Sequence, residues 1–94
     1  MLLFVFEVTP SLANPLRKIT EIKTKNSVRS MLRKGHGLLL GEYNGWLEVF
    51  NMSSATITQT RKIREGATIK DIVAIDESHF LLASDDGILK STMD

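Results

Sequence analysis

The stretch LLLGEYNGWLEVF, residues 38–50, decides the fold because it holds two apolar runs separated by an asparagine–glycine pair. Asn-Gly suits the two positions of a type I′ turn that need positive φ, and this turn joins the strands of a tight β-hairpin. In the second run, Trp46 and Phe50 fall on one face of a strand and Leu47 and Val49 on the other. The stretch therefore predicts a hairpin whose second strand is buried on both faces.

A second copy of this pattern lies in FLLASDDGILKST, residues 80–92, with Asp86-Gly87 at the position of the turn. Arg17-Lys18-Ile19 recurs as Arg61-Lys62-Ile63, which is a shift of 44 residues, and other matches fall at shifts of 41 and 42. Repeats of this length occur in helical arrays and in β-propellers. The local pattern must therefore decide between the two.

That local pattern is typical of short β-strands. Runs rich in Val, Ile, Leu, Phe and Thr are separated by turn-forming Asn, Asp, Gly and Ser, and no stretch sustains the 3.6-residue period of an amphipathic helix. We expect antiparallel three-stranded meanders over 28–52 and 68–93, the second packed on the first. The remaining strands are expected at 2–8, 15–24 and 55–63, although 15–24 also fits a helix where it lacks a neighbouring strand edge.

Composition excludes several kinds of chemistry. The 94 residues are 43% apolar and 24% charged, which is ordinary for a globular protein. The chain has no cysteine, so disulfides, thiolate zinc sites and cysteine nucleophiles are excluded. The apolar opening is interrupted by Glu7, is too short to span a bilayer and lacks the basic start of a signal peptide. We therefore expect a soluble intracellular protein, in the simplest case cytoplasmic.

These features together resemble the WD-repeat family. GLLLGEYNGWLEVFN, residues 37–51, looks like the second strand, turn and third strand of a repeat, with Phe50-Asn51 at the place of the closing Trp-Asp. Phe6-Glu7 and Thr92-Met93 stand at that place in the other copies, and Gly66-Ala67 stands near the place of the Gly-His step. The resemblance implies an all-β fold made of antiparallel β-meander blades of a β-propeller, in an incomplete ring.

The resemblance also implies how the chain is divided. Residues 1–24 would end one blade, residues 25–63 would form the next, and residues 64–94 would begin a third. A propeller closes with four or more blades, so we expect a fragment of a longer protein or a protomer that completes its ring by self-association. We favour the fragment, because the open edges and faces of a free chain would be sticky.

The function implied by the resemblance is a non-catalytic protein–protein interaction scaffold that binds another protein or peptide. In WD-repeat proteins the loops between second and third strands, and between outer and first strands, often contact partners. Trp46 beside the turn is expected to be blade core, the other interpretation being an interface anchor. The candidate binding residues are Lys25, Asn26, Tyr43, Asn44, Asp85 and Asp86.

A basic segment supports an alternative function. Residues 17–34 hold seven Lys and Arg against the single acid Glu21. Such a segment can bind nucleic acid or anionic lipid, or an acidic protein. The solvated outer faces of strands explain the same charges equally simply.

We find no enzyme signature in the sequence. Asp76-Glu77-Ser78-His79 brings carboxylates, a hydroxyl and an imidazole together, but in an expected turn, where such residues are common. Asp85-Asp86 lacks the spacing of a calcium loop, and Gly35-His36-Gly37 lacks that of a phosphate loop. We therefore expect no catalytic residues, no metal and no cofactor.

Overall fold

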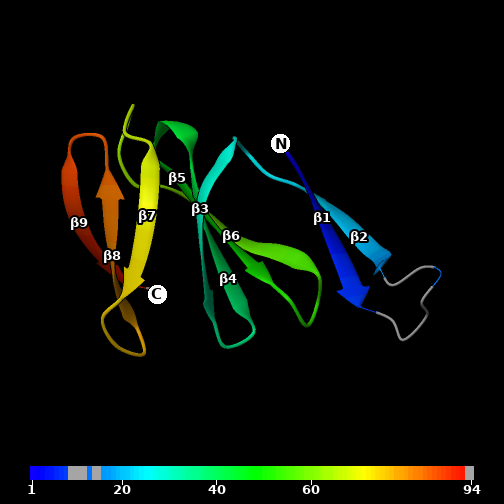
Figure 1. Ribbon diagram of the computed structural model, residues 1–94. Helices are drawn as coiled ribbons and strands as arrows, with labels where there is room; N and C mark the ends of the chain where they lie inside the picture. Colours follow the sequence, from blue (N-terminus) through cyan, green and yellow to red (C-terminus); the bar gives the residue numbers. More distant parts are fainter. Residues whose placement is uncertain (9–12, 14–15, 93–94) are drawn as a thin grey trace.

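The computed structural model describes residues 1–8, 13 and 16–92, and this part of the chain is all-β (Figure 1). Its strands form three antiparallel sheets in the orders β1-β2, β3-β4-β5-β6 and β7-β8-β9. The strands are β1 (Leu2–Val8), β2 (Leu16–Lys23), β3 (Val28–Lys34), β4 (Gly37–Glu42), β5 (Trp46–Asn51), β6 (Thr56–Lys62), β7 (Ile69–Ala74), β8 (His79–Ser84) and β9 (Gly87–Thr92), with one 3₁₀ turn, η1 (Tyr43–Gly45), between β4 and β5.

The two larger sheets are the predicted meanders, because each strand pairs antiparallel with the next one along the chain. The first contains a fourth strand, β6, which pairs with β5 at the outer edge. Residues 16–23 form a strand rather than a helix, since β1 offers them an edge. The prediction that the second meander extends to Met93 falls outside the described residues.

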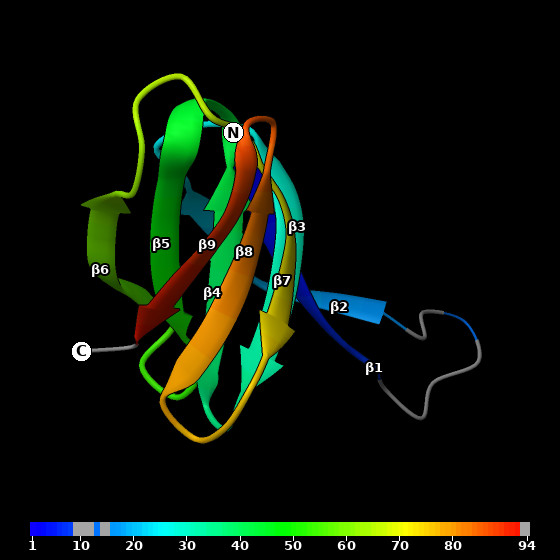
Figure 2. The same cartoon turned by 90° about the vertical axis from the view of Figure 1, so that its left-hand side faces the viewer.

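The four-stranded sheet lies between the other two (Figures 1 and 2). One of its faces packs on the third sheet and the other on the β1-β2 hairpin. Leu47 is 2% exposed and Phe50 is 3% exposed, so β5 is buried on both faces, as predicted. The first interface contains Leu39, Leu47, Val49, Ile69, Ile72, Phe80 and Leu82, and the second contains Ile22, Leu40 and Phe50, with Leu3 and Val5 packed against them.

The second and third sheets approach closely at Gly41 of β4. A Cβ atom here would lie 2.3 Å from Ser30 Oγ and 2.6 Å from Ile69 Cγ2, closer than a side chain tolerates. In the same place the Ser30 hydroxyl donates a hydrogen bond to the Ile69 carbonyl oxygen at 2.9 Å. Glycine therefore allows the close approach, and the hydrogen bond fixes the spacing of β3 and β7.

The turn predictions are partly confirmed. Asn44 and Gly45 have the expected positive φ, 65° and 80°, although the connection has three residues instead of two. The type I′ turn predicted at Asp86-Gly87 is wrong, because Ser84 pairs with Gly87 and Asp86 does not have a positive φ. The Ser84 hydroxyl bonds to the Asp86 carboxylate at 2.9 Å and to the Gly87 carbonyl at 2.9 Å, which stabilises the observed turn.

Candidate binding rim

Four connections gather at one end of the stacked sheets, drawn at the top of Figure 1. They comprise residues 24–27, 43–45, 63–68 and 85–86, and we call this end the rim. All six candidate binding residues lie in these connections. Thr68 links two of them, because its hydroxyl accepts a hydrogen bond from Asn44 N–H at 3.5 Å while its own N–H donates to Asp85 Oδ2 at 3.2 Å.

A buried pair of carboxyl groups holds the first connection in place. Lys25 N–H donates to Glu48 Oε1 at 2.6 Å, and Asn26 N–H donates to Glu42 Oε1 at 2.8 Å. The other oxygen of Glu48 accepts the hydroxyl proton of Thr60 at 2.6 Å. Glu42 is 0% exposed and Glu48 is 4% exposed. The carboxyl pair therefore positions Lys25 and Asn26 through their backbone.

The two carboxyl groups hold one proton between them at neutral pH. Burial raises the pKa of Glu42 to about 8, and a hydrogen bond with Glu48 adds to this shift. Burial by itself would raise the pKa of Glu48, but hydrogen bonds from Glu42, Thr60 and Lys25 N–H lower it. Within the described residues no N–H or O–H donates to the buried Glu42 Oε2, which is a further reason why the neutral form of this carboxyl group is favoured.

Trp46 supports the same part of the rim. The ammonium groups of Lys25 and Lys62 both lie over its ring, each 4.8 Å from the ring centroid. The sequence left two interpretations of Trp46 open, blade core and interface anchor, and the structure shows a half-buried side chain. Cation–π attraction keeps the Lys25 side chain folded over the ring.

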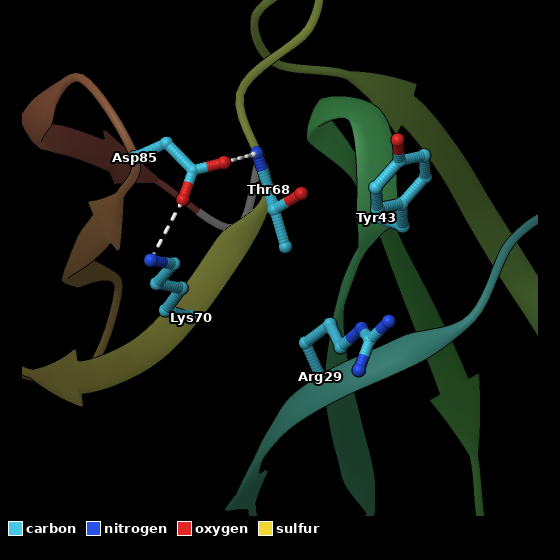
Figure 3. A pocket seen from close by; sticks show the side chains of 5 residues that line it. All are labelled: Arg29, Tyr43, Thr68, Lys70 and Asp85. Carbon is cyan, nitrogen blue, oxygen red and sulfur yellow. Dashed lines mark hydrogen bonds and ion pairs between the residues drawn. The ribbon is translucent and has the colours of Figure 1, made fainter.

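A pocket of about 360 Å³ opens on the rim between the second and third sheets (Figure 3). Arg29 and Tyr43 form one side, and Thr68, Lys70 and Asp85 form the other. Lys70 Nζ lies 2.8 Å from Asp85 Oδ1. The hydrogen bond from Lys70, followed by that from Thr68 N–H, lowers the pKa of Asp85. The pocket thus combines two cations, one carboxylate and one aromatic ring.

Of these five residues, the sequence pointed to Tyr43 and Asp85 as rim residues, and to Arg29 only as one cation of the basic segment 17–34. The sequence missed Thr68 and Lys70, because they lie at the start of the second meander, where no turn marks them. A signal was nevertheless present. Val28 aligns with Ile69 in the repeat, so Arg29 and Lys70 occupy equivalent positions of successive copies.

The remaining candidate, Asp86, lies beside the pocket and not in its lining. Its carboxylate accepts hydrogen bonds from Ser84 and, at 3.2 Å, from Arg64. These two interactions, that from Ser84 first, lower its pKa. Asp86 therefore contributes a fixed negative charge to the rim.

The cations of the basic segment 17–34 are divided between two sheets. They belong to β2, β3 and the connection between them. Lys18 pairs with Glu21, and Arg33 Nε donates to the Gly35 carbonyl oxygen at 3.3 Å. Part of the charge is thus compensated locally.

The residues considered for acid–base chemistry stabilise a turn. Asp76 Oδ1 accepts the N–H groups of Ser78 at 3.0 Å and His79 at 2.9 Å, and it lies 2.8 Å from His79 Nδ1. These hydrogen bonds, that from Ser78 N–H first, lower the pKa of Asp76 to about 2. Neither a cluster of three or more metal-ligating side chains nor a helix able to cross a membrane occurs in the part of the chain that the structure describes.

No protein-family model and no curated protein matches the chain.

Proposed function

We propose that this protein is a non-catalytic interaction scaffold of WD-repeat type, that its sheets are blades of a β-propeller, and that its rim binds another protein or peptide. The observation that carries the proposal is the gathering of all six candidate binding residues at one end of the molecule, around a pocket between two repeats.

Two features support the assignment as propeller blades. The central sheet is a four-stranded meander whose strands follow the order of the chain. Both of its faces are covered by sheets from neighbouring copies of the repeat. A blade pressed between two other blades needs this burial, whereas a one-sided sheet does not.

The rim has the features of a protein-binding surface. Tyr43 is 54% exposed, and amphipathic aromatic side chains of this kind are common anchors in interfaces. Its backbone is fixed, since Tyr43 N–H donates to the Ser27 carbonyl oxygen at 2.9 Å. An anchor on an ordered backbone loses little conformational freedom when a partner binds.

Site-specific photocross-linking tests this function. The Tyr43→p-benzoylphenylalanine variant should cross-link to a discrete protein in cells that express the chain, since the probe stands on the rim. The matched control is Ser54→p-benzoylphenylalanine, which places the probe in the β5–β6 connection at the opposite end. Equal products from the two positions, or none from position 43, would rule out the rim as the binding surface.

The alternative, nucleic-acid or anionic-lipid binding through 17–34, predicts a different result. Contacts between Lys or Arg and phosphates make affinity fall steeply with salt. A labelled oligonucleotide or phosphatidylserine vesicles that bind with such a salt dependence, and are released by charge reversal in β2, would favour the alternative. The division of these cations between two sheets makes it the second choice.

A further inference from the structure

We propose that the pocket between Arg29 and Lys70 binds a carboxylate group, supplied by an aspartate or glutamate side chain of a protein partner. This inference rests on the proposed function, because it names the group that the partner places on the rim.

Arg29 supplies the main recognition element. It is exposed on β3, and no other described residue pairs with its guanidinium group. In Figure 3 its side chain lies on the same side of the pocket as Tyr43. A guanidinium group presents parallel N–H donors that match the two oxygens of a carboxylate. Arg29 therefore has donors in place for an anionic group that this chain itself does not provide.

The charge balance of the pocket favours an anion. Asp85 is already compensated, because it accepts hydrogen bonds from Lys70 and from Thr68 N–H. Lys70 has three N–H donors and uses one of them for Asp85. Two cations against one acid leave an excess positive charge in the lining of the pocket.

The walls of the pocket are ordered before a ligand enters. Ser30 follows Arg29 in the sequence, and Ile69 precedes Lys70. The hydrogen bond from the Ser30 hydroxyl to the Ile69 carbonyl oxygen therefore fixes the distance between the backbone of Arg29 and that of Lys70. Thr68 is 8% exposed and is hydrogen-bonded to Asn44 and Asp85. Because the walls are already ordered, the entropic cost of ligand binding is lower.

The surroundings favour the carboxylate of a protein over a phosphate chain. Asp85 lines the pocket and Asp86 lies beside it, so the two cations of the lining do not continue into the row of positive charges that an extended polyanion needs. Tyr43 is the sole aromatic residue lining the pocket within the described chain, whereas single-stranded nucleic acids bind on several stacked aromatic rings. A volume of about 360 Å³ accommodates one side chain of a peptide.

NMR titration of the full chain tests the inference. The probe is N-acetyl-glutamate N-methylamide, and its neutral counterpart is the glutamine analogue. We expect the glutamate probe to shift the backbone amides of Tyr43, Thr68 and Lys70 with a Kd of roughly 1–10 mM, and the glutamine analogue to produce no saturable shift. Arg29→Gln should weaken glutamate binding by about tenfold or more, as expected for the loss of a charge-assisted bidentate pair.

Arg33→Gln is the matched control, because Arg33 is also exposed on β3 and its loss removes the same charge from the same strand. We expect it to change the affinity by less than about twofold, since screening in water weakens distant charges. Amide dispersion in both variants establishes that each is folded.

Three results would overturn the inference: equal binding of the glutamine analogue, equal weakening by the two arginine variants, or tighter binding of inorganic phosphate with shifts at the same amides. The cross-linking experiment at Tyr43 does not depend on an acidic group. A discrete cross-link without carboxylate binding would therefore retain the scaffold function and remove this inference alone.

Discussion

Glu42 and Glu48 lie in adjacent strands beneath the rim as a hydrogen-bonded carboxyl pair, with Glu42 protonated and Glu48 ionised at neutral pH. Each accepts a backbone N–H from the connection that carries Lys25 and Asn26. The conformation of this connection, and with it part of the rim, is therefore coupled to one buried proton.

This coupling predicts that stability falls as the pH rises from about 4.5 to about 8. The folded chain keeps the Glu42 proton to about pH 8, whereas the unfolded chain loses it near 4.5. The free energy of unfolding should decline by up to about 1.4 kcal/mol per pH unit in this window. Glu48 acts in the opposite sense, because its lowered pKa gives stability that is present above pH 4.5 and is lost as the pH falls.

Urea unfolding of the Glu42→Gln variant between pH 5 and pH 8.5 measures the effect. Glutamine stays neutral and can still donate to Glu48, so we expect the downward slope to disappear. Glu77→Gln removes an exposed carboxylate from the β7–β8 turn and should leave the slope as it is. If the free energy of unfolding of Glu42→Gln declines with pH as steeply as that of the wild-type chain, Glu42 does not hold the proton.

Two glycines provide a test of the contact between η1 and the β6–β7 connection. Gly45 and Gly66 have similar positive φ, 80° and 76°, so alanine brings a comparable backbone strain of about 1–2 kcal/mol at both positions. A Cβ at Gly45 would lie 1.7 Å from the Arg64 carbonyl oxygen, whereas Gly66 has open space. Gly45→Ala should therefore lower the free energy of unfolding more than Gly66→Ala does. We expect the difference between the two variants to be at least about 2 kcal/mol, which is typical of a large steric overlap. Equal losses would contradict this contact.

The interface between the second and third sheets should dominate stability. Phe80 is 1% exposed in the larger core cluster, so Phe80→Ala should lower the free energy of unfolding by about 3–5 kcal/mol. Ile88 is 72% exposed on β9, and Ile88→Ala should change the free energy of unfolding by about 0.5 kcal/mol or less. Thermal unfolding followed by circular dichroism measures the loss of stability in both variants. A small loss in Phe80→Ala would mean that the two sheets fold independently.

The sequence predicts the strands and the stacking better than the chemistry of the rim. Short apolar runs and turn residues locate every sheet, and the apolar residues on both faces of β5 predict its burial. The carboxyl pair was not predicted, because Glu42 and Glu48 become neighbours only through the pairing of Gly41 with Leu47. Two acids within otherwise apolar strands were the available signal.

The prediction of the pocket was incomplete for a related reason. Its two sides come from segments about 40 residues apart, and only the stacking of successive repeats brings them together. The shape of the Asp85–Asp86 turn also escaped prediction. There the Ser84 hydroxyl and the Asp86 carboxylate form local hydrogen bonds that override the preference of Asp-Gly for a type I′ turn.

The outer face of the β1-β2 hairpin should promote self-association of the chain. Leu2, Phe4 and Ile19 are each about half-exposed there, and exposed apolar surface beside open strand edges favours association. Light scattering should show a mass that rises with protein concentration over tens of micromolar, roughly the range in which such edges aggregate. The Ile19→Lys variant should have a lower average mass than the wild-type chain at the same protein concentration, because more of it is monomeric. A monodisperse wild-type chain with a cooperative melt would indicate a self-contained fold.

The close approach at Gly41 also has a geometric consequence. Because the β4 backbone already meets Ile69 here, the missing side chain sets how near the second and third sheets can come to each other. A larger residue in place of Gly41 would push β7 away from β4 and lengthen the hydrogen bond between Ser30 and the Ile69 carbonyl oxygen. The width of the pocket between Arg29 and Lys70 therefore depends on a residue that lies outside its lining.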